Sequence, residues 1–369
     1  MKVGILHFWT LRMRRGVETL VVSLANELAK RGNDVTIITA RQTLEPLVLP
    51  APRVRVRAFP TFRYYEFATI VPFYVADLVS ERYDIVIAFF ADFGEGEALR
   101  LASAFTRPRL FLYLTFPYES APHRYQSYKR WGWEKEAACI LADAEYTARN
   151  GEVFFQRPVQ LLPSGTDASR FRPDPERRAA TRRRLGFGEG DIVLLNVAAL
   201  ERRKGAWRVI EALPIVRARC PTVRYLVLGE GAERGRLQGR AEELGISQSV
   251  IFAGTTTDLP SYYNAADIFV MLPDSEAGSI ACLEAMASEL PVVVSNTGGF
   301  GEAVGPRCGR IVDISEPGGI ADSILQLASD GALRCELGEG GRRVVTERYS
   351  WDRIGENLHG LCWQMVRGG

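Results

Sequence analysis

The sequence lacks several features that would assign it to a specialised class of protein. It has only six cysteines among 369 residues and no Cys-x-x-Cys pair, so reduced thiols are expected rather than a zinc ribbon or a disulfide framework. Its formal net charge is only +2, which argues against a nucleic-acid partner. No apolar run approaches the roughly 20 residues that cross a bilayer. Residues 1–9 enter a folded pattern at once, so no signal peptide is expected.

Two segments nevertheless raise the question of membrane contact. The longest mostly apolar stretch, residues 67–79, contains Pro72 and favours a buried helix, with an apolar acceptor groove or a membrane-facing helix as the alternative. The tract 124–133 mixes cations with aromatic residues. It favours a solvated helix with a packed aromatic face over a membrane surface or a site for a phosphate-bearing acceptor. The expected location is the cytoplasm, with peripheral contact to the inner face of the membrane left open.

What the sequence does contain is a regular alternation of short apolar runs and amphipathic stretches. At 47% hydrophobic and 24% charged residues it describes a globular α/β protein, and its length suggests two domains. A helix is expected over residues 16–31, and the alternating cations Arg53, Arg55 and Arg57 indicate an edge strand. Other strands are expected at residues 3–7, 35–39, 84–90, 109–114, 138–141, 159–162, 192–197, 225–228, 250–252, 268–272 and 291–295.

A polar stretch rich in proline and arginine, residues 164–190, separates two such series of elements. We therefore expect an N-terminal Rossmann-like domain over residues 1–170 and a C-terminal one over residues 171–349. Both are predicted to be doubly wound, and a ligand would lie at the carboxyl ends of their strands.

The loop of residues 274–287 places Glu276 just before a helix and Glu284 in its second turn. A helix that begins near Ser279 points free N–H groups at whatever lies above the preceding strand, which attracts phosphate. A carboxylate at Glu284 can accept the two hydroxyls of a ribose. Taken alone, however, two glutamates at this spacing are more often ordinary helix-start and surface residues.

Other segments add charge and tight turns near the same edge of the expected sheet. The run Glu201-Arg202-Arg203-Lys204-Gly205 follows the first strand of the second domain, where a diphosphate needs cations. Its common alternative is a solvated surface cluster. Gly229 and Gly231 close the next strand and allow a tight turn or a close approach by a ligand, although a single Gly-x-Gly is a weak signal.

These pieces occur together with other short motifs in one order along essentially the whole chain. They are Gly16-Val17-Glu18, Pro163-Ser164-Gly165-Thr166-Asp167, Lys204-Gly205, Gly229-Glu230-Gly231, residues 250–254, the Glu276 to Glu284 loop, Pro291-Val292-Val293, Gly298-Gly299 and Tyr349-Ser350-Trp351. The ordered set resembles the family-4 glycosyltransferases, which have the GT-B architecture of two Rossmann-like domains that face a central cleft. The final segment, residues 350–369, resembles the helix that packs back onto the first domain.

The resemblance implies a nucleoside-diphosphate sugar, UDP- or GDP-type, as donor, and retention of anomeric configuration without a metal or cofactor. No Asp-x-Asp motif occurs. Lys204 would bind the diphosphate and Glu276 would face the transferred sugar. The remaining donor-binding residues would be Gly16, Arg15, Arg203, Gly229, Phe252, Gly254, Gly278, Ser279, Ile280 and Glu284. The acceptor, chosen by residues 61–74 and 116–133, could be a small molecule, a glycan or a lipid-linked compound.

Four departures from the family pattern bear on activity. Ala199 stands where the family usually has an arginine, and Arg14-Arg15-Gly16 has one glycine where two are usual. Thr115 stands near the usual position of a histidine, for which His123 is the candidate replacement. Gly278-Ser279 replaces the usual Phe-Gly. The alternatives to a transferase are a catalytically silent binding partner of the same fold, or a nucleotide-sugar epimerase or phosphorylase.

Overall fold

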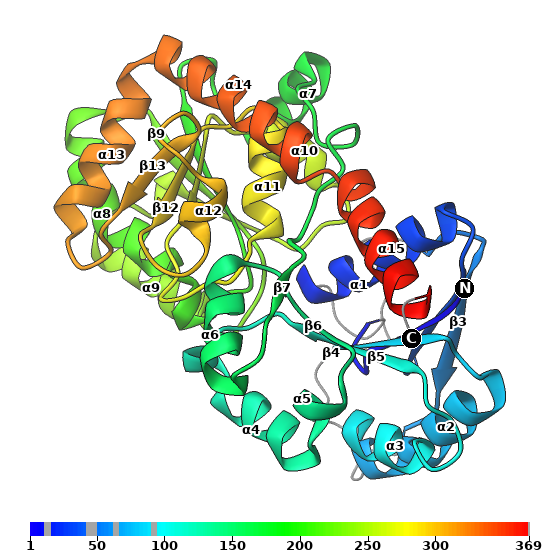
Figure 1. Ribbon diagram of the computed structural model, residues 1–369. Helices are drawn as coiled ribbons and strands as arrows, with labels where there is room; N and C mark the ends of the chain where they lie inside the picture. The colour runs from blue at the N-terminus through cyan, green and yellow to red at the C-terminus, as the bar shows by residue number, and fades with distance from the viewer. Residues whose placement is uncertain (11–15, 42–49, 62–65, 90–93, 368–369) are drawn as a thin grey trace. The chain divides into compact units, whose positions relative to one another are not determined.

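The computed structural model describes residues 1–10, 16–41, 50–61, 66–89 and 94–367 (Figure 1). The chain divides into two compact units. The first comprises Met1–Ser164 together with the C-terminal segment from Trp351, and the second comprises Gly165–Ser350. The boundaries drawn from the sequence, at residues 170 and 349, differ from these by a few residues.

The first unit contains a seven-stranded sheet in the order β3-β2-β1-β4-β5-β6-β7, and all its neighbouring strands are parallel. Its strands are β1 (Lys2–Leu6), β2 (Asp34–Ala40), β3 (Val54–Phe59), β4 (Ile85–Phe89), β5 (Arg109–Leu114), β6 (Cys139–Ala142) and β7 (Gln160–Leu161). Its helices are α1 (Gly16–Lys30), α2 (Glu66–Glu81), α3 (Glu95–Ala102), α4 (Pro122–Trp131), α5 (Trp133–Glu136), α6 (Glu145–Phe155) and α15 (Trp351–Arg367).

Helices α2 to α6 contribute to one apolar core against this sheet. Ile70, Tyr74 and Leu78 repeat every four residues along α2 and are buried, which confirms the interpretation of a buried helix for that face. In α4, Tyr125 and Tyr128 are buried while the cations Lys129 and Arg130 are exposed, as expected for a solvated helix with a packed aromatic face.

Helix α15 packs on α1 within the first unit. A side chain at Gly355 would overlap Glu27, so the two helices approach closely. Lys30 and Arg31 each make a 2.9 Å ion pair with Asp352 at the start of α15. The C-terminal helix therefore belongs to the unit that also holds the first strand.

The second unit contains a six-stranded parallel sheet in the order β10-β9-β8-β11-β12-β13. Its strands are β8 (Ile192–Val197), β9 (Val223–Leu228), β10 (Val250–Gly254), β11 (Ile268–Met271), β12 (Val292–Ser295) and β13 (Gly309–Val312). Its helices are α7 (Pro175–Leu185), α8 (Ala206–Arg219), α9 (Arg234–Glu243), α10 (Leu259–Ala265), α11 (Ile280–Ala287), α12 (Phe300–Ala303), α13 (Pro317–Ser329) and α14 (Gly331–Arg348). The edge strand β13 is absent from the strands expected from the sequence.

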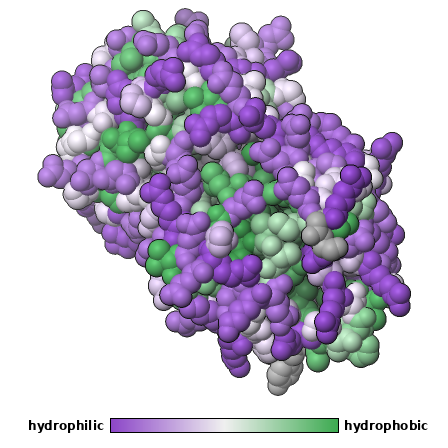
Figure 2. Space-filling view, viewed as in Figure 1, coloured by the Kyte–Doolittle hydropathy of each residue, from purple (hydrophilic) through white to green (hydrophobic). Residues whose placement is uncertain are grey.

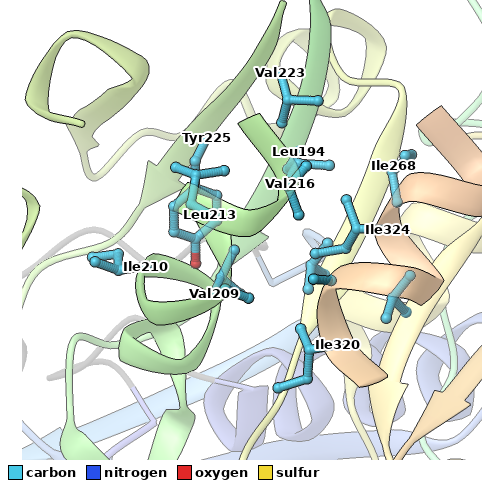
Figure 3. Packing of buried hydrophobic residues seen from close by; sticks show 14 of the residues in the cluster. Leu194, Val209, Ile210, Leu213, Val216, Val223, Tyr225, Ile268, Ile320 and Ile324 are labelled. Atoms are coloured by element: carbon cyan, nitrogen blue, oxygen red, sulfur yellow. The ribbon is translucent and has the colours of Figure 1, made fainter. Parts of the chain in front are cut away.

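Two apolar clusters cover the two faces of this second sheet. On one face Val209, Leu213 and Val216 of α8 meet Ile320 and Ile324 of α13 (Figure 3). On the other face the cluster is formed with side chains of α10 and α11. All members of both clusters lie between residues 165 and 350, so the second unit holds a complete core of its own.

The two ends of the second unit lie next to each other. The Thr166 N–H donates to the Tyr349 carbonyl over 2.8 Å, and Thr166 forms a parallel β-bridge with Ser350. The chain therefore enters and leaves this unit at one place.

Hydrophilic side chains prevail on the face drawn in Figure 2. In the parts of the chain that the structure describes, none of the helices combines the length and hydrophobicity that a membrane crossing requires.

Candidate functional site

The order of the second sheet reverses direction between β8 and β11, which are neighbours although β9 and β10 separate them along the chain. At such a switch point the loops after the two strands diverge and leave a crevice outside their carboxyl ends. Here the loop after β8 carries residues 198–205, and the loop after β11 carries residues 272–279. The two sequence segments richest in candidate residues thus meet at one edge of the sheet.

Lys204 and Glu276 form an ion pair across these two loops. Their side chains are 15% and 17% exposed, so the charges are largely shielded from water. The loops also touch through their backbones, because the Asp274 N–H donates to the Arg203 carbonyl over 2.8 Å. Gly205, at φ +74°, lies so close to the Leu272 carbonyl that a Cβ would overlap it.

Helix α11 begins as the sequence predicts, with Ser279 as its N-cap residue. The Ser279 hydroxyl accepts the Cys282 N–H over 3.2 Å. Among the described residues, the N–H groups of Ile280 and Ala281 have no hydrogen-bond partner. The first turn of α11 thus presents free donors, beside the half-buried Gly278.

Glu284 is buried in the second turn of α11, at 8% exposed, so it is not an ordinary surface residue. Its Oε2 accepts a 2.8 Å hydrogen bond from the Tyr263 hydroxyl of α10. Burial raises the pKa of this carboxyl to about 7, against the smaller opposing effects of the Tyr263 hydrogen bond and the Arg170 charge. Sequence reasoning missed Tyr263, which lies in a short buried helix with no motif of its own.

The glycine turns of the second unit have structural roles in the free protein. A Cβ at Gly229, whose φ is +147°, would overlap the Ala198 carbonyl after β8. The Gly229 N–H donates to the Gly254 carbonyl at the end of β10 over 2.7 Å. Phe252 of β10 packs partly buried against the α8 side of the sheet. The Gly299 N–H donates to the Glu276 carbonyl over 2.8 Å and so supports the backbone at Glu276.

The arginine side chains near Lys204 make different contacts from one another. Arg203 pairs with Glu201 at 2.8 Å and is 45% exposed. The Arg202 guanidinium lies 3.9 Å from the centre of the Trp207 ring. Ala199 offers no charge at the position where the resemblance implies an arginine.

The candidates in the first unit are less concentrated. Gly16 is the exposed first residue of α1, while Arg15 lies outside the described residues. Thr115 is buried directly after β5, and His123 is exposed in the first turn of α4. Within the described ranges, no hydrogen bond or ion pair joins His123 to Thr115.

Sequence reasoning also passed over His7, which directly follows β1. It is fully buried, and its Nδ1 is 2.8 Å from the Thr10 hydroxyl. Burial, with a smaller contribution from Arg124, lowers its pKa to about 3, so the ring is neutral at physiological pH. The sequence signal that could have identified His7 is its position at the end of a parallel strand, near the point where the strand order of the first sheet reverses.

Comparison with known proteins decides the family. The family model described as "Glycosyltransferase Family 4" matches residues 14–170, and the model described as "Glycosyl transferases group 1" matches residues 177–344. The chain belongs to the family-4 glycosyltransferases. Within this family the two Rossmann-like units correspond to the GT-B architecture, as the resemblance implies.

Two relatives of this glycosyltransferase chain are mannosyltransferases by name. One is the GDP-mannose-dependent monoacylated alpha-(1-6)-phosphatidylinositol monomannoside mannosyltransferase of Corynebacterium glutamicum, 33% identical over 64% of each chain. The other is the GDP-mannose-dependent alpha-(1-6)-phosphatidylinositol monomannoside mannosyltransferase of Mycobacterium tuberculosis, 33% identical over 54% of each chain. The matches thus span less than two thirds of these relatives' length.

A solved structure matches this chain over nearly its whole length. Anabaena HepE, solved in complex with UDP-glucose, has a TM-score of 0.83 at 18% identity and covers 99% of this chain and 100% of its own. At this level of identity the match establishes the shared fold.

Proposed function

We propose that this glycosyltransferase-family chain transfers a sugar from a nucleoside-diphosphate sugar to an acceptor hydroxyl with retention of anomeric configuration. The observation that carries the proposal is the meeting of Lys204, Glu276 and the first turn of α11 at the switch point of the second sheet. The GDP-mannose dependence named for two relatives favours a GDP-type donor, with a UDP-type donor as the alternative.

The diphosphate would bind where cations and backbone donors coincide. Lys204 and the free N–H groups of Ile280 and Ala281 would stabilise the negative charge that develops on the departing diphosphate. Arg203 would add positive charge at the rim if it exchanged Glu201 for phosphate. This charge would serve in place of a metal ion, and no cofactor besides the donor is proposed.

The remaining contacts would orient the donor. Glu284, next to the same helix start, would accept the ribose hydroxyls, and Glu276 would face the transferred sugar once donor phosphate replaced it at Lys204. Phe252, Gly254 and Gly229 would border the base, and Gly278 with Ser279 would line the sugar pocket. Gly16 and Arg15 of the first unit would approach the phosphates, and His123 would act near the reacting centre.

The acceptor class is proposed more broadly. A small molecule, a glycan or a lipid-linked compound would bind to the first unit, and the phosphatidylinositol mannoside named for two relatives favours a lipid-linked one. Peripheral membrane contact would follow from such an acceptor. All six cysteines are unpaired in the structure, which suits a cytoplasmic setting.

A donor panel tests the proposal. GDP-mannose, UDP-glucose and related UDP-, GDP- and dTDP-sugars are screened. The donor that the protein uses is expected to stabilise it against heat and to release its nucleoside diphosphate when a lipid or glycan acceptor is present. Lys204→Met should lower kcat about 100-fold because it removes a charge that acts on the leaving group. Lys30→Met, which breaks the exposed Lys30–Asp352 pair, is the matched control and should leave kcat unchanged. The absence of stabilisation and turnover with every donor would refute the proposal.

Ala199 supports a second candidate, a binding protein of the same fold that no longer transfers sugar. In that case a donor would stabilise the protein and no product would form with any acceptor. An epimerase would instead convert the donor without an acceptor, which NMR of the recovered nucleotide-sugar would detect.

A further inference from the structure

A second ion pair joins the start of α8 to the loop after β11, beside the Lys204–Glu276 pair of the candidate donor site. Arg208 lies in the first turn of α8, one turn after Lys204. Its Nη2 donates to the Asp274 carboxylate over 2.6 Å, and its Nη1 donates to the Leu272 carbonyl over 3.1 Å. Both acceptors belong to the loop after β11, two and four residues before Glu276.

The Arg208 guanidinium is held in place from several sides. Its side chain is only 11% exposed, and its Cζ lies 4.4 Å from the centre of the Trp207 ring. The same ring carries Arg202, whose Cζ is 3.9 Å from its centre. A planar guanidinium whose two nitrogens donate to two different acceptors fixes their relative position, which a lysine could not do.

The magnitude of this interaction argues against a role in overall stability. Asp274 is 51% exposed, and ion pairs with a solvent-exposed partner typically contribute about 0–1 kcal/mol. The position of the loop can affect the reaction rate much more than the stability, because a displacement of about 1 Å at a reacting group can lower the rate about 100-fold. The contact is therefore better suited to set geometry than to hold the fold together.

The two ion pairs differ in what the donor would do to them. Lys204 and Glu276 would have to separate when the diphosphate and the sugar bind to them, which removes one link between the loops. Arg208 and Asp274 have no donor group assigned to them, so their link would persist. The loop that carries Glu276 would then keep its position relative to the loop that carries Lys204.

We propose that Arg208 is a positioning residue that, through Asp274 and the Leu272 carbonyl, keeps Glu276 in place after Lys204 has released it. This inference rests on the proposed function. Its test compares Arg208→Met, Asp274→Ala and the double variant in steady-state kinetics with the donor that the unaltered protein uses. Each single variant is expected to lower kcat about 10- to 100-fold with donor KM changed less than about threefold, because donor contacts remain while the geometry is lost.

The kcat of the double variant should be no lower than that of the slower single variant, since both substitutions remove the same Arg208–Asp274 contact. The matched control is Arg217→Met. Arg217 lies in the last turn of the same helix and also donates to two acceptors, in its case the backbone carbonyls of Pro221 and Val223, at 2.7 and 2.8 Å. It should lower the melting temperature at least as much as Arg208→Met and leave kcat unchanged.

The outcomes separate this inference from the function on which it rests. If the unaltered protein turns over a donor but Arg208→Met keeps kcat within twofold, or if the two single effects multiply in the double variant, the positioning role is wrong and the function stands. If the unaltered protein neither binds nor uses any donor of the panel, the function fails and the positioning role fails with it.

Discussion

At the scale of single residues, Glu284 combines burial with a charge that its surroundings oppose. The Glu284 carboxyl lies between α10 and α11, beside the apolar cluster to which these two helices contribute. Among the described residues, the Tyr263 hydroxyl donates a hydrogen bond to it. Burial moves its pKa from about 4.5 to about 7. Ionisation of Glu284 therefore costs free energy in the free protein, and a bound polyol whose hydroxyls donate hydrogen bonds to the carboxylate would lower that cost.

Glu284→Gln tests this balance through stability. With the folded-state pKa raised, the carboxyl is neutral in both states at low pH, and its ionisation destabilises the fold increasingly as the pH rises from about 4.5 to about 7. At 1.36 kcal/mol per pKa unit, the cost above pH 7 is about 3 kcal/mol. Glu284→Gln should therefore raise the melting temperature much more at pH 8 than at pH 5.

The exposed Glu339 on α14 is the control, and Glu339→Gln should shift the melting temperature little at both pH values. An equal gain from Glu284→Gln at pH 5 and pH 8 would contradict the raised pKa.

The sequence could identify Glu284 as a candidate but could not predict its environment. Its spacing from Glu276 and from the N-cap Ser279 is local information. Its burial depends on Tyr263, which stands 21 residues earlier on another helix. Likewise, the contacts of Arg208 with Leu272 and Asp274 span more than sixty residues and follow no motif.

At the scale of elements, the junction of β8 with α8 is held by a backbone contact. The 3₁₀ turn of Arg202–Lys204 ends at Gly205, whose left-handed conformation lets the chain pass beneath the Leu272 carbonyl. The junction thus sets how closely the loops after β8 and β11 approach each other.

Gly205→Ala should destabilise the protein by more than the about 1–3 kcal/mol that a left-handed non-glycine residue costs, because the added methyl would also overlap the Leu272 carbonyl. Gly245→Ala provides the comparison, since Gly245 has a similar φ of +68° and open space around its Cα. Chemical denaturation of both variants measures the difference. Equal losses for the two would show that the loop shifts away without cost.

Most elements of the sheets were accessible from the sequence, for reasons visible in particular strands. The ranges 109–114 and 192–197 coincide with β5 and β8, which are largely buried apolar runs between clear breaks. β13 was not predicted because it holds no continuous buried apolar run, and at the edge of the sheet Ile311 is 45% exposed. Lys204 and Glu276 could be brought together because the doubly wound topology makes β8 and β11 neighbours.

At the scale of the whole molecule, the two units differ in the number of chain segments that form them. The second is one continuous segment, whereas the first needs both the N-terminal part and α15. Each unit has its own apolar core. The second unit therefore meets the condition for folding alone. Residues 1–164 also hold an apolar core, but without α15 they leave uncovered the face of α1 on which α15 packs.

We expect a fragment of residues 165–350 to unfold cooperatively, as circular dichroism on heating would show. A fragment of residues 1–164 should be less stable, because it loses the packing of Gly355 on Glu27 and the ion pairs of Asp352. Adding a peptide of residues 351–367 should restore part of that stability. A non-cooperative 165–350 fragment, or a 1–164 fragment as stable as the full chain, would contradict this division.

The bridge between Thr166 and Ser350 has a consequence for how such proteins can be recombined. Since the second unit begins and ends at adjoining residues, it can be treated as a cassette whose two joints, 164/165 and 350/351, lie at one spot. A homologous cassette of different length could be exchanged there without stretching the remaining chain, provided that its own ends adjoin. Under the proposed function, the donor preference would be exchanged together with residues 165–350, and the acceptor preference would stay with the rest of the chain.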